Sequence, residues 1–431
     1  MPGADRCRAY KGPRRAPVPP VTHNLALSMA LFGGLLLMAV LLDNMAARIK
    51  VPGILLVLVL GLLIDNDLTA LPGQSSPLLS LNRAEQLSQL SLVLVLFFGG
   101  LTTNWGEMRM VIRPAMRLAT LGSLLMAAAI TAYVLFLQGL PVSAVHVHLA
   151  GALFIGAMFC STDASATLGL LRPLSGRLPQ RLIDLLECES AFNDPMAVVL
   201  AGLALALAMG ESGQNSQVVV EVVRQFLLGV FLGFIGGKAA GLLLTSPRSQ
   251  AYGSLGAVVS LGLLMVVVGG SNLVGASGLL AAYLMGLVEG NDPQVDRNLL
   301  EEAHAGFAKL AELVLFLCLG LVVDPNDVVK AFVWAVLLLL GLMVSRWLVV
   351  EVLLFRSGYA RQERLFTTLA GLRGAVPVAI AIQAAASPVP WGATMPPLAL
   401  AVVLLGLIAQ GLSLVPVAGL LGLVHDAPGA P

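Results

Sequence analysis

Three acidic residues crowd into one short stretch of an otherwise apolar chain. The stretch ECESAFNDPMAVVL holds Glu187, Glu189 and Asp194, although only 11% of the 431 residues are charged. Residues of a helix advance by about 100° each, so Ser190 and Asp194 lie on one face with Glu187 on the same side. Glu189 and Asn193 share the neighbouring face. One face therefore offers a carboxylate and a hydroxyl, and the next offers a carboxylate and an amide.

A second interpretation keeps these acids outside the bilayer. Residues 181–194 would form an amphipathic turn at the interface, and the membrane helix would begin at Pro195, because proline fits the first turn of a helix. In the first interpretation, Pro195 instead bends one continuous helix. The stretch alone leaves both interpretations open.

Another acid interrupts the apolar segment at residues 149–170. The stretch CSTDASA places Asp163 there, beside the hydroxyl of Thr162. An ionised carboxylate inside lipid is costly unless it is solvated or paired, and unwound backbone frees carbonyl groups that can line an ion site. The alternative is that the segment ends near Cys160 and that Asp163 caps the next helix.

An arginine balances these acids. Arg373 lies in GLRGAVP, which interrupts the apolar segment at residues 364–386. A guanidinium stays protonated, so it needs an anionic partner or carbonyl groups. We predict an ion pair between Glu189 and Arg373, which leaves Asp163 and Asp194 for a ligand. The alternative is that Arg373 binds carbonyl groups at its own helix break.

Two carboxylates inside a bilayer suit a hard monovalent cation or a proton. Burial disfavours the charged form of Asp163 and Asp194, so one site can hold either a proton or a metal ion. That competition is itself an exchange mechanism, and it needs no ATP-binding motif. Glu187 and Arg346 receive no role from the sequence, although Arg346 can pair with Glu351 or reach an interface.

The composition predicts an all-α protein that crosses the lipid bilayer many times. Hydrophobic residues make up 58% of the chain and the mean hydropathy is +0.90. The apolar segments are long and continuous, which favours helices over the alternating strands of a barrel. The net charge of +1 gives no indication of a nucleic-acid partner, and the four cysteines show no metal-ligand spacing. Neither an enzyme activity nor a cofactor is expected.

Hydropathy predicts about thirteen helical segments. They cover residues 25–43, 51–64, 87–102, 115–137, 149–170, 181–209, 218–243, 252–269, 272–290, 306–323, 328–355, 364–386 and 396–424. The fifth and the twelfth are the interrupted ones, and they occupy the same place in segments 4–6 and 11–13. This correspondence predicts an inverted repeat with a binding site at the two breaks.

Basic residues predict the side of each loop. Connections after odd-numbered segments hold most of the lysines and arginines, so these loops and the C-terminus are predicted to be cytoplasmic. Residues 1–24 form a basic, Pro-rich tail that we expect to be disordered, and residues 425–431 form a short second tail. Thirteen spans would put the basic tail outside the cell. Either the first segment does not span, or the tail is not part of the mature protein.

These motifs resemble those of a known family. STDASATLGLL, LECESAFNDPMAVVL and GLRGAVPVAIAI closely resemble the monovalent cation:proton antiporters, in particular the bacterial NhaP-type and cell-volume-regulation branch of the first cation:proton antiporter family. GASGLLAAYLMGLVEGN (Gly275–Asn291) and LVLFLCLGLVVDP (Leu313–Pro325) match two further stretches. The resemblance runs from about Leu25 to Val424.

The resemblance implies a fold and an assembly. Its members have thirteen helices, a six-helix core domain with two crossed, broken helices, and a dimerisation domain. On this pattern, residues 25–102 and 252–323 form the dimerisation domain, residues 115–209 and 328–424 form the core, and residues 218–243 link them. The protein would then be a homodimer in the inner membrane.

The resemblance also implies two groups of site residues. The cation- and proton-binding group is Asp163, Asp194, Ser190 and Thr162, which would be the metal ligands for transported Na+ or K+. The structural group is the ion pair of Glu189 and Arg373, with Asn193. The Asn-Asp pair resembles the electroneutral branch, with one cation per proton. Phe98 is a departure, because many relatives carry an acid at that place, where it could tune access or pH response.

We therefore predict a secondary antiporter that exchanges Na+ or K+ for H+ by movement of the core domain. A cation-coupled solute symporter or a cation channel remains an alternative, because fold alone does not settle transport mode. A remote alternative is an intramembrane serine protease, since GASG resembles a rhomboid nucleophile motif with Ser277. Such an enzyme needs a histidine base in a membrane helix, and His304 and His425 lie outside the predicted segments.

Overall fold

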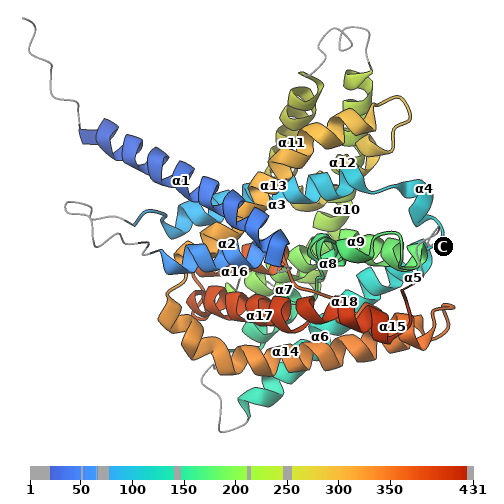
Figure 1. The fold of residues 1–431 in the computed structure, drawn as a ribbon. Coiled ribbons are helices and arrows are strands. Elements are labelled where there is room, and N and C mark those ends of the chain that lie inside the picture. Colours follow the sequence, from blue (N-terminus) through green and yellow to red (C-terminus); the bar gives the residue numbers. More distant parts are fainter. Residues whose placement is uncertain are drawn as a thin grey trace, which may run out of the picture.

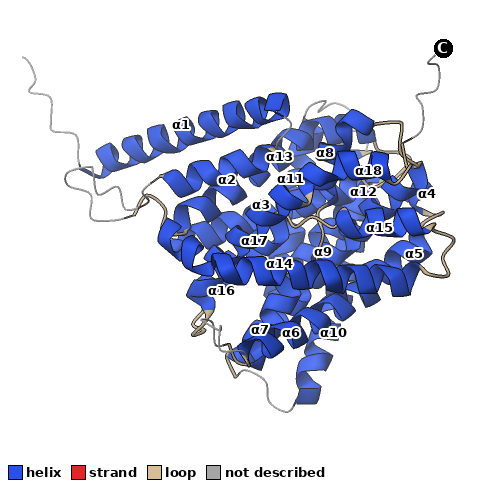
Figure 2. Cartoon of the chain, turned by 60° about the horizontal axis from the view of Figure 1, so that its bottom comes forward, coloured by secondary structure: helices blue, strands red, loops and turns tan. Residues whose placement is uncertain are grey.

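The protein is a bundle of helices. The computed structural model describes residues 20–49, 52–64, 66, 77–139, 147–210, 215–245 and 255–424, and every regular element among them is a helix (Figures 1 and 2). Nine of the described helices are long and apolar enough to cross a membrane, and four shorter apolar helices accompany them. The predicted fold class, an all-α polytopic membrane protein, is confirmed.

The long spans include both single helices and helices continued by a short turn. They are α1 (Pro20–Ile49), α3 (Leu81–Thr102), α5 (Ile112–Arg117) with α6 (Ser123–Gln138), α9 (Gln180–Ala208), α10 (Asn215–Leu244), α11 (Gly256–Leu273), α13 (Arg297–Val322), α14 (Pro325–Leu354), and α17 (Met395–Ala409) with α18 (Leu414–Leu420). The shorter apolar helices are α2 (Gly53–Leu63), α7 (Leu149–Met158), α12 (Gly278–Gly290) and α16 (Ala375–Ala386). The remaining α-helices are α4 (Trp105–Met108), α8 (Ala164–Leu171) and α15 (Arg361–Leu369).

Each predicted apolar segment falls on one of these helices or helix pairs, with shifted ends. Helix α1 begins at Pro20, five residues before the predicted start, and lies at the edge of the bundle (Figures 1 and 2). Residues 1–19 and 425–431, which hold most of the two predicted tails, lie outside the described residues. The count of thirteen crossings stays a prediction, because four of the helices are short.

Helix α9 is continuous through Pro195, so the interpretation that the membrane helix begins at this proline is wrong. Proline removes one backbone hydrogen bond from the helix. Leu185 and Leu186 before it and Ala197 and Ala201 after it are all buried. Packing on both sides of Pro195 therefore holds the two halves in one helix.

Two helices are broken where they meet. Residues between α7 and α8 are unwound, and so are residues between α15 and α16. The N–H of Asp163 donates to the carbonyl of Leu372 at 2.8 Å, and the hydroxyl of Thr167 donates to the carbonyl of Ala370 at 2.8 Å. The predicted pair of crossed, broken helices is therefore present, and the breaks bond to each other.

Helices α3 and α12 pack with their backbones in close contact. A Cβ at Gly100 would overlap the carbonyl of Tyr283, and a Cβ at Gly286 would overlap the carbonyl of Phe97. These helices also share a second, smaller hydrophobic core with α10, α11 and α13. Its buried members are Val93, Phe97, Leu101, Ala240, Leu264, Val268, Ala282, Met285 and Leu300. The larger core holds the two broken helices together with α6, α9, α14 and α17.

Candidate functional site

Side chains of α9 hold the unwound stretch before α8. The hydroxyl of Ser190 donates to the carbonyl of Thr162 at 2.7 Å and accepts from the N–H of Ala164 at 3.1 Å. The side-chain amide of Asn193 donates to the Thr162 hydroxyl at 2.8 Å, and its oxygen accepts from the Thr162 N–H at 3.3 Å. Asn193 therefore binds the break itself and belongs with Thr162, not with a distant ion pair.

The carboxylate of Asp163 makes two contacts at the break. Its Oδ1 accepts from the N–H of Ala166 at 2.9 Å, which caps α8 as the alternative interpretation expected. Its carboxylate also lies against Gly374 of the other broken helix, where any Cβ would overlap it. Asp163 is half-buried and lines a cavity, so the capping role does not remove it from the site.

The structure brings the two predicted ligand aspartates into one cavity. Asp163, Asp194 and Thr162 line a cavity of about 240 Å³. Asp194 and Ser190 also line a larger cavity of about 570 Å³. All four residues of the predicted cation- and proton-binding group therefore line one or both of two cavities that share Asp194.

The predicted ion pair between Glu189 and Arg373 is wrong. Glu189 accepts two hydrogen bonds from Arg346 of α14, one of them from Nη2 at 2.8 Å, and both side chains are buried. Arg373 instead donates to the carbonyl of Phe159 at 3.1 Å and to the carbonyl of Gly371. The alternative interpretation, in which Arg373 binds carbonyl groups at its own helix break, is correct for Gly371, whereas Phe159 ends α7 at the other break.

The sequence carried a signal for the true partner. Arg346 lies in an apolar stretch, MVSRWLVV, and a buried arginine requires an anion. Glu351, which the sequence offered as a partner, binds Arg364 instead. Arg364 donates two hydrogen bonds to the Glu351 carboxylate, each of 2.9 Å. The two buried guanidiniums also lie close together, since a Cβ at Gly371 would be 3.0 Å from Arg346 and 3.2 Å from Arg373.

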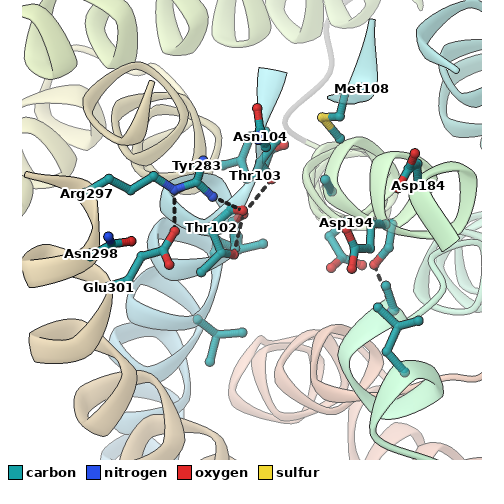
Figure 3. A pocket seen from close by; sticks show the side chains of 18 residues that line it. Thr102, Thr103, Asn104, Met108, Asp184, Asp194, Tyr283, Arg297, Asn298 and Glu301 are labelled. Atoms are coloured by element: carbon teal, nitrogen blue, oxygen red, sulfur yellow. Dashed lines mark hydrogen bonds and ion pairs between the residues drawn. The ribbon is translucent and has the colours of Figure 1, made fainter. Parts of the chain in front are cut away.

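The larger cavity, which we call the funnel, lies between α9 and α13 and is also lined by α3 (Figure 3). Asp184 and Glu187 line it on the α9 side, one to two helical turns from Ser190. On the opposite side, Arg297 forms an ion pair with Glu301 of the same helix. Glu187, whose role the sequence left open, therefore lies along the funnel at the end where α9 and α13 begin.

With this geometry in place, comparison with known proteins decides the family. Residues 33–419 match the family described as "Sodium/hydrogen exchanger, transmembrane". The chain belongs to this family. Among members of similar sequence, the K(+)/H(+) antiporter NhaP2 of Shewanella sp. (strain ANA-3) is 32% identical over 396 residues, which is 90% of this chain and 66% of that protein. The chain thus spans 66% of the length of this relative.

The exchanger family also includes archaeal relatives of known structure. The Na(+)/H(+) antiporter 1 of Methanocaldococcus jannaschii is 25% identical over 372 residues, and the match covers 83% of each chain. The solved structure of the sodium proton antiporter MjNhaP1 from Methanocaldococcus jannaschii at pH 8 matches with a TM-score of 0.77 at 22% identity. The match covers 92% of this chain and 99% of that one, and it shows the same fold.

The protease alternative finds no support in the geometry around Ser277. Ser277 caps α12, where its hydroxyl accepts from the N–H of Leu280 at 3.3 Å. His304, placed outside the membrane segments by the sequence, is in fact buried in α13 with its ring 5.1 Å from that of Phe97. Among the described residues no hydrogen bond joins Ser277 to His304, and His304 Nε2 has no hydrogen-bond partner there.

Proposed function

We propose that the protein is a secondary antiporter that exchanges a monovalent cation, Na+ or K+, for H+. One observation carries the proposal: Asp163 and Asp194 line the same cavity at the crossing of two broken helices. Membership of the sodium/hydrogen exchanger family and relatives named as K(+)/H(+) and Na(+)/H(+) antiporters support it.

The two aspartates can bind the cation and the proton in turn. A dehydrated monovalent cation needs oxygen ligands, and carboxylates supply charge as well as oxygen. Protonation removes that charge, so a bound proton and a bound cation exclude each other. Ser190 and Thr162 are proposed as further ligands. The Ser190 hydroxyl donates one bond and accepts one, which leaves a lone pair free for a cation.

Movement of one domain against the other would expose the site alternately. We propose that residues 115–209 and 328–424 form the moving core and that residues 25–102 and 252–323 form the dimerisation domain, linked by residues 218–243. The proposed assembly is a homodimer in the inner membrane with a cytoplasmic C-terminus and electroneutral exchange, one cation per proton.

The test is a pH-gradient assay in everted membrane vesicles. Addition of Na+, K+ or Li+ in turn should dissipate a preset pH gradient, and Asp194→Asn should abolish this dissipation for every cation. Asp327→Asn is the matched control, because Asp327 is exposed at the start of α14 and pairs with the exposed Lys330. Undiminished exchange in Asp194→Asn would refute the site, and a flux that simply follows the membrane voltage would indicate a channel.

A further inference from the structure

Helix α13 places a lysine and a glutamate on the wall that faces the ion site. Lys309 and Glu312 line the same cavity of about 240 Å³ as Asp163 and Asp194. The Lys309 ammonium lies 3.2 Å from the Glu312 carboxylate and 3.2 Å from the carboxylate of Asp43 on α1. We call Asp43, Lys309 and Glu312 the Lys309 triad.

The triad is held by the packing of three helices. A Cβ at Gly53, the first residue of α2, would overlap the Asp43 carboxylate, so the glycine makes room for it. Asp43 and Glu312 are largely buried, with side-chain exposures of 29% and 20%, whereas Lys309 is 44% exposed. The two acids therefore anchor an ammonium group that remains accessible from the cavity.

A bare ammonium in this cavity would oppose cation binding. Like charges repel, and the repulsion is stronger inside a protein than in water. Two carboxylates against one ammonium give the triad a net charge of −1, so its acids cancel the repulsion. The remaining described lining residues on α3 and α16 carry no charge.

We propose that the Lys309 triad sets the cation affinity of the site at the two aspartates. Glu312 and Asp43 neutralise Lys309, so the ammonium does not repel the cation from that site. Lys309 and Glu312 are thus specificity-determining residues that act across the cavity, while the aspartates bind the ion. This inference rests on the proposed cation:proton exchange.

Two single variants should shift exchange in opposite directions. Glu312→Gln leaves the ammonium paired with Asp43 alone and raises the net charge of the triad by one, so the half-saturating cation concentration should rise by about three- to tenfold. Lys309→Gln removes the ammonium, so the half-saturating cation concentration should fall.

A double variant and a matched pair complete the experiment. Lys309→Gln with Glu312→Gln removes both charges and should return the half-saturating cation concentration toward that of the wild type. The control pair is Lys330 and Asp327, which has the same three-residue spacing but is exposed on α14. Lys330→Gln and Asp327→Asn should leave the half-saturating cation concentration unchanged.

The outcomes separate this inference from the proposed function. A wild-type protein that exchanges no cation for protons would overturn the proposed function itself. A wild-type protein that exchanges normally, with both single variants unshifted or shifted in the same direction, would overturn only the role of the triad. If the triad were merely structural, the variants would yield less folded protein or a slower exchange rate. Neither effect would shift the half-saturating cation concentration in opposite directions and restore it in the double variant.

Discussion

At the residue scale, the centre of the molecule holds one carboxylate beside two guanidiniums. Glu189 binds Arg346, and Arg373 is left with backbone carbonyl groups. Arg346 Nε and Arg373 Nη2 have no hydrogen-bond partner among the described residues. Both side chains and Gln410 line a cavity of about 10 Å³, which approaches the size needed for one water molecule. The Glu189–Arg346 pair therefore carries most of the charge compensation here.

Loss of this buried pair should strongly destabilise the protein. Glu189→Gln leaves the Arg346 guanidinium buried without an anion, which typically costs about 3–5 kcal/mol. The expected result is a large drop in the thermal unfolding temperature of the purified protein in detergent. Glu351→Gln is the matched control, because the Glu351 side chain is 31% exposed and its loss should therefore cost less than that of the fully buried Glu189.

A double-mutant cycle distinguishes the two candidate partners of Glu189. Substitutions at Glu189 and Arg346 should be strongly coupled, since either one breaks the same bidentate pair. Substitutions at Glu189 and Arg373 should show a smaller coupling free energy than those at Glu189 and Arg346. A stronger coupling to Arg373 would reverse the assignment made from the geometry.

The sequence could name the charged residues of the centre but not their pairs. The helical periodicity of the stretch around Glu189 separates its face from that of Asp194. It contains no information about which distant helix lies opposite each face. Arg346 and Arg373 are both arginines in apolar segments, and only the packing of α14 against the breaks decides which of them reaches Glu189.

At the element scale, glycines set the distance between α3 and α12. Gly100 and Gly286 allow the two backbones to come into contact. Gly290 at the end of α12 likewise contacts the backbone of Leu101 on α3. Helix α3 also lines both cavities, with Gly99 and Thr102 shared between them. The wall that faces the ion site is therefore positioned by this tight helix pair.

A methyl group at the α3–α12 contact should disturb this wall. A Cβ at Gly286 would overlap the backbone carbonyl of Phe97, and backbone cannot rotate away as a side chain can. Overpacking of this kind costs about 1–3 kcal/mol, so Gly286→Ala should lower the unfolding temperature and the exchange rate. Gly262→Ala on α11, where a Cβ meets nothing within 4 Å, should be neutral. Equal unfolding temperatures for the two variants would contradict the close packing.

The breaks in the two central helices could be predicted, because their causes are local. Gly, Pro and polar residues within an apolar run disfavour a continuous helix wherever the chain is placed. The continuity of α9 through Pro195 could not be predicted in the same way. It depends on tertiary packing before and after the proline, which local preferences do not describe.

At the scale of the whole molecule, the larger cavity extends from the ion site toward the end where α9 and α13 begin. It is lined by Asp194 and by Glu187, which lies about 10 Å from Asp194 along the axis of α9. The loops at this end are those predicted to be cytoplasmic from their basic residues. The arrangement thus predicts a site that is open to the cytoplasm.

Labelling of single cysteines tests this orientation directly. In a background without the four native cysteines, Glu187→Cys should react with a membrane-impermeant thiol reagent in everted vesicles but not in intact cells. The comparison site is Asn326→Cys, which is exposed at the start of α14, in a connection predicted to lie outside. It should react only in intact cells. The reverse pattern at both positions would invert the predicted topology. Reaction of Glu187→Cys from the outside alone would mean that the funnel opens away from the cytoplasm, and the conformation would then be outward-facing.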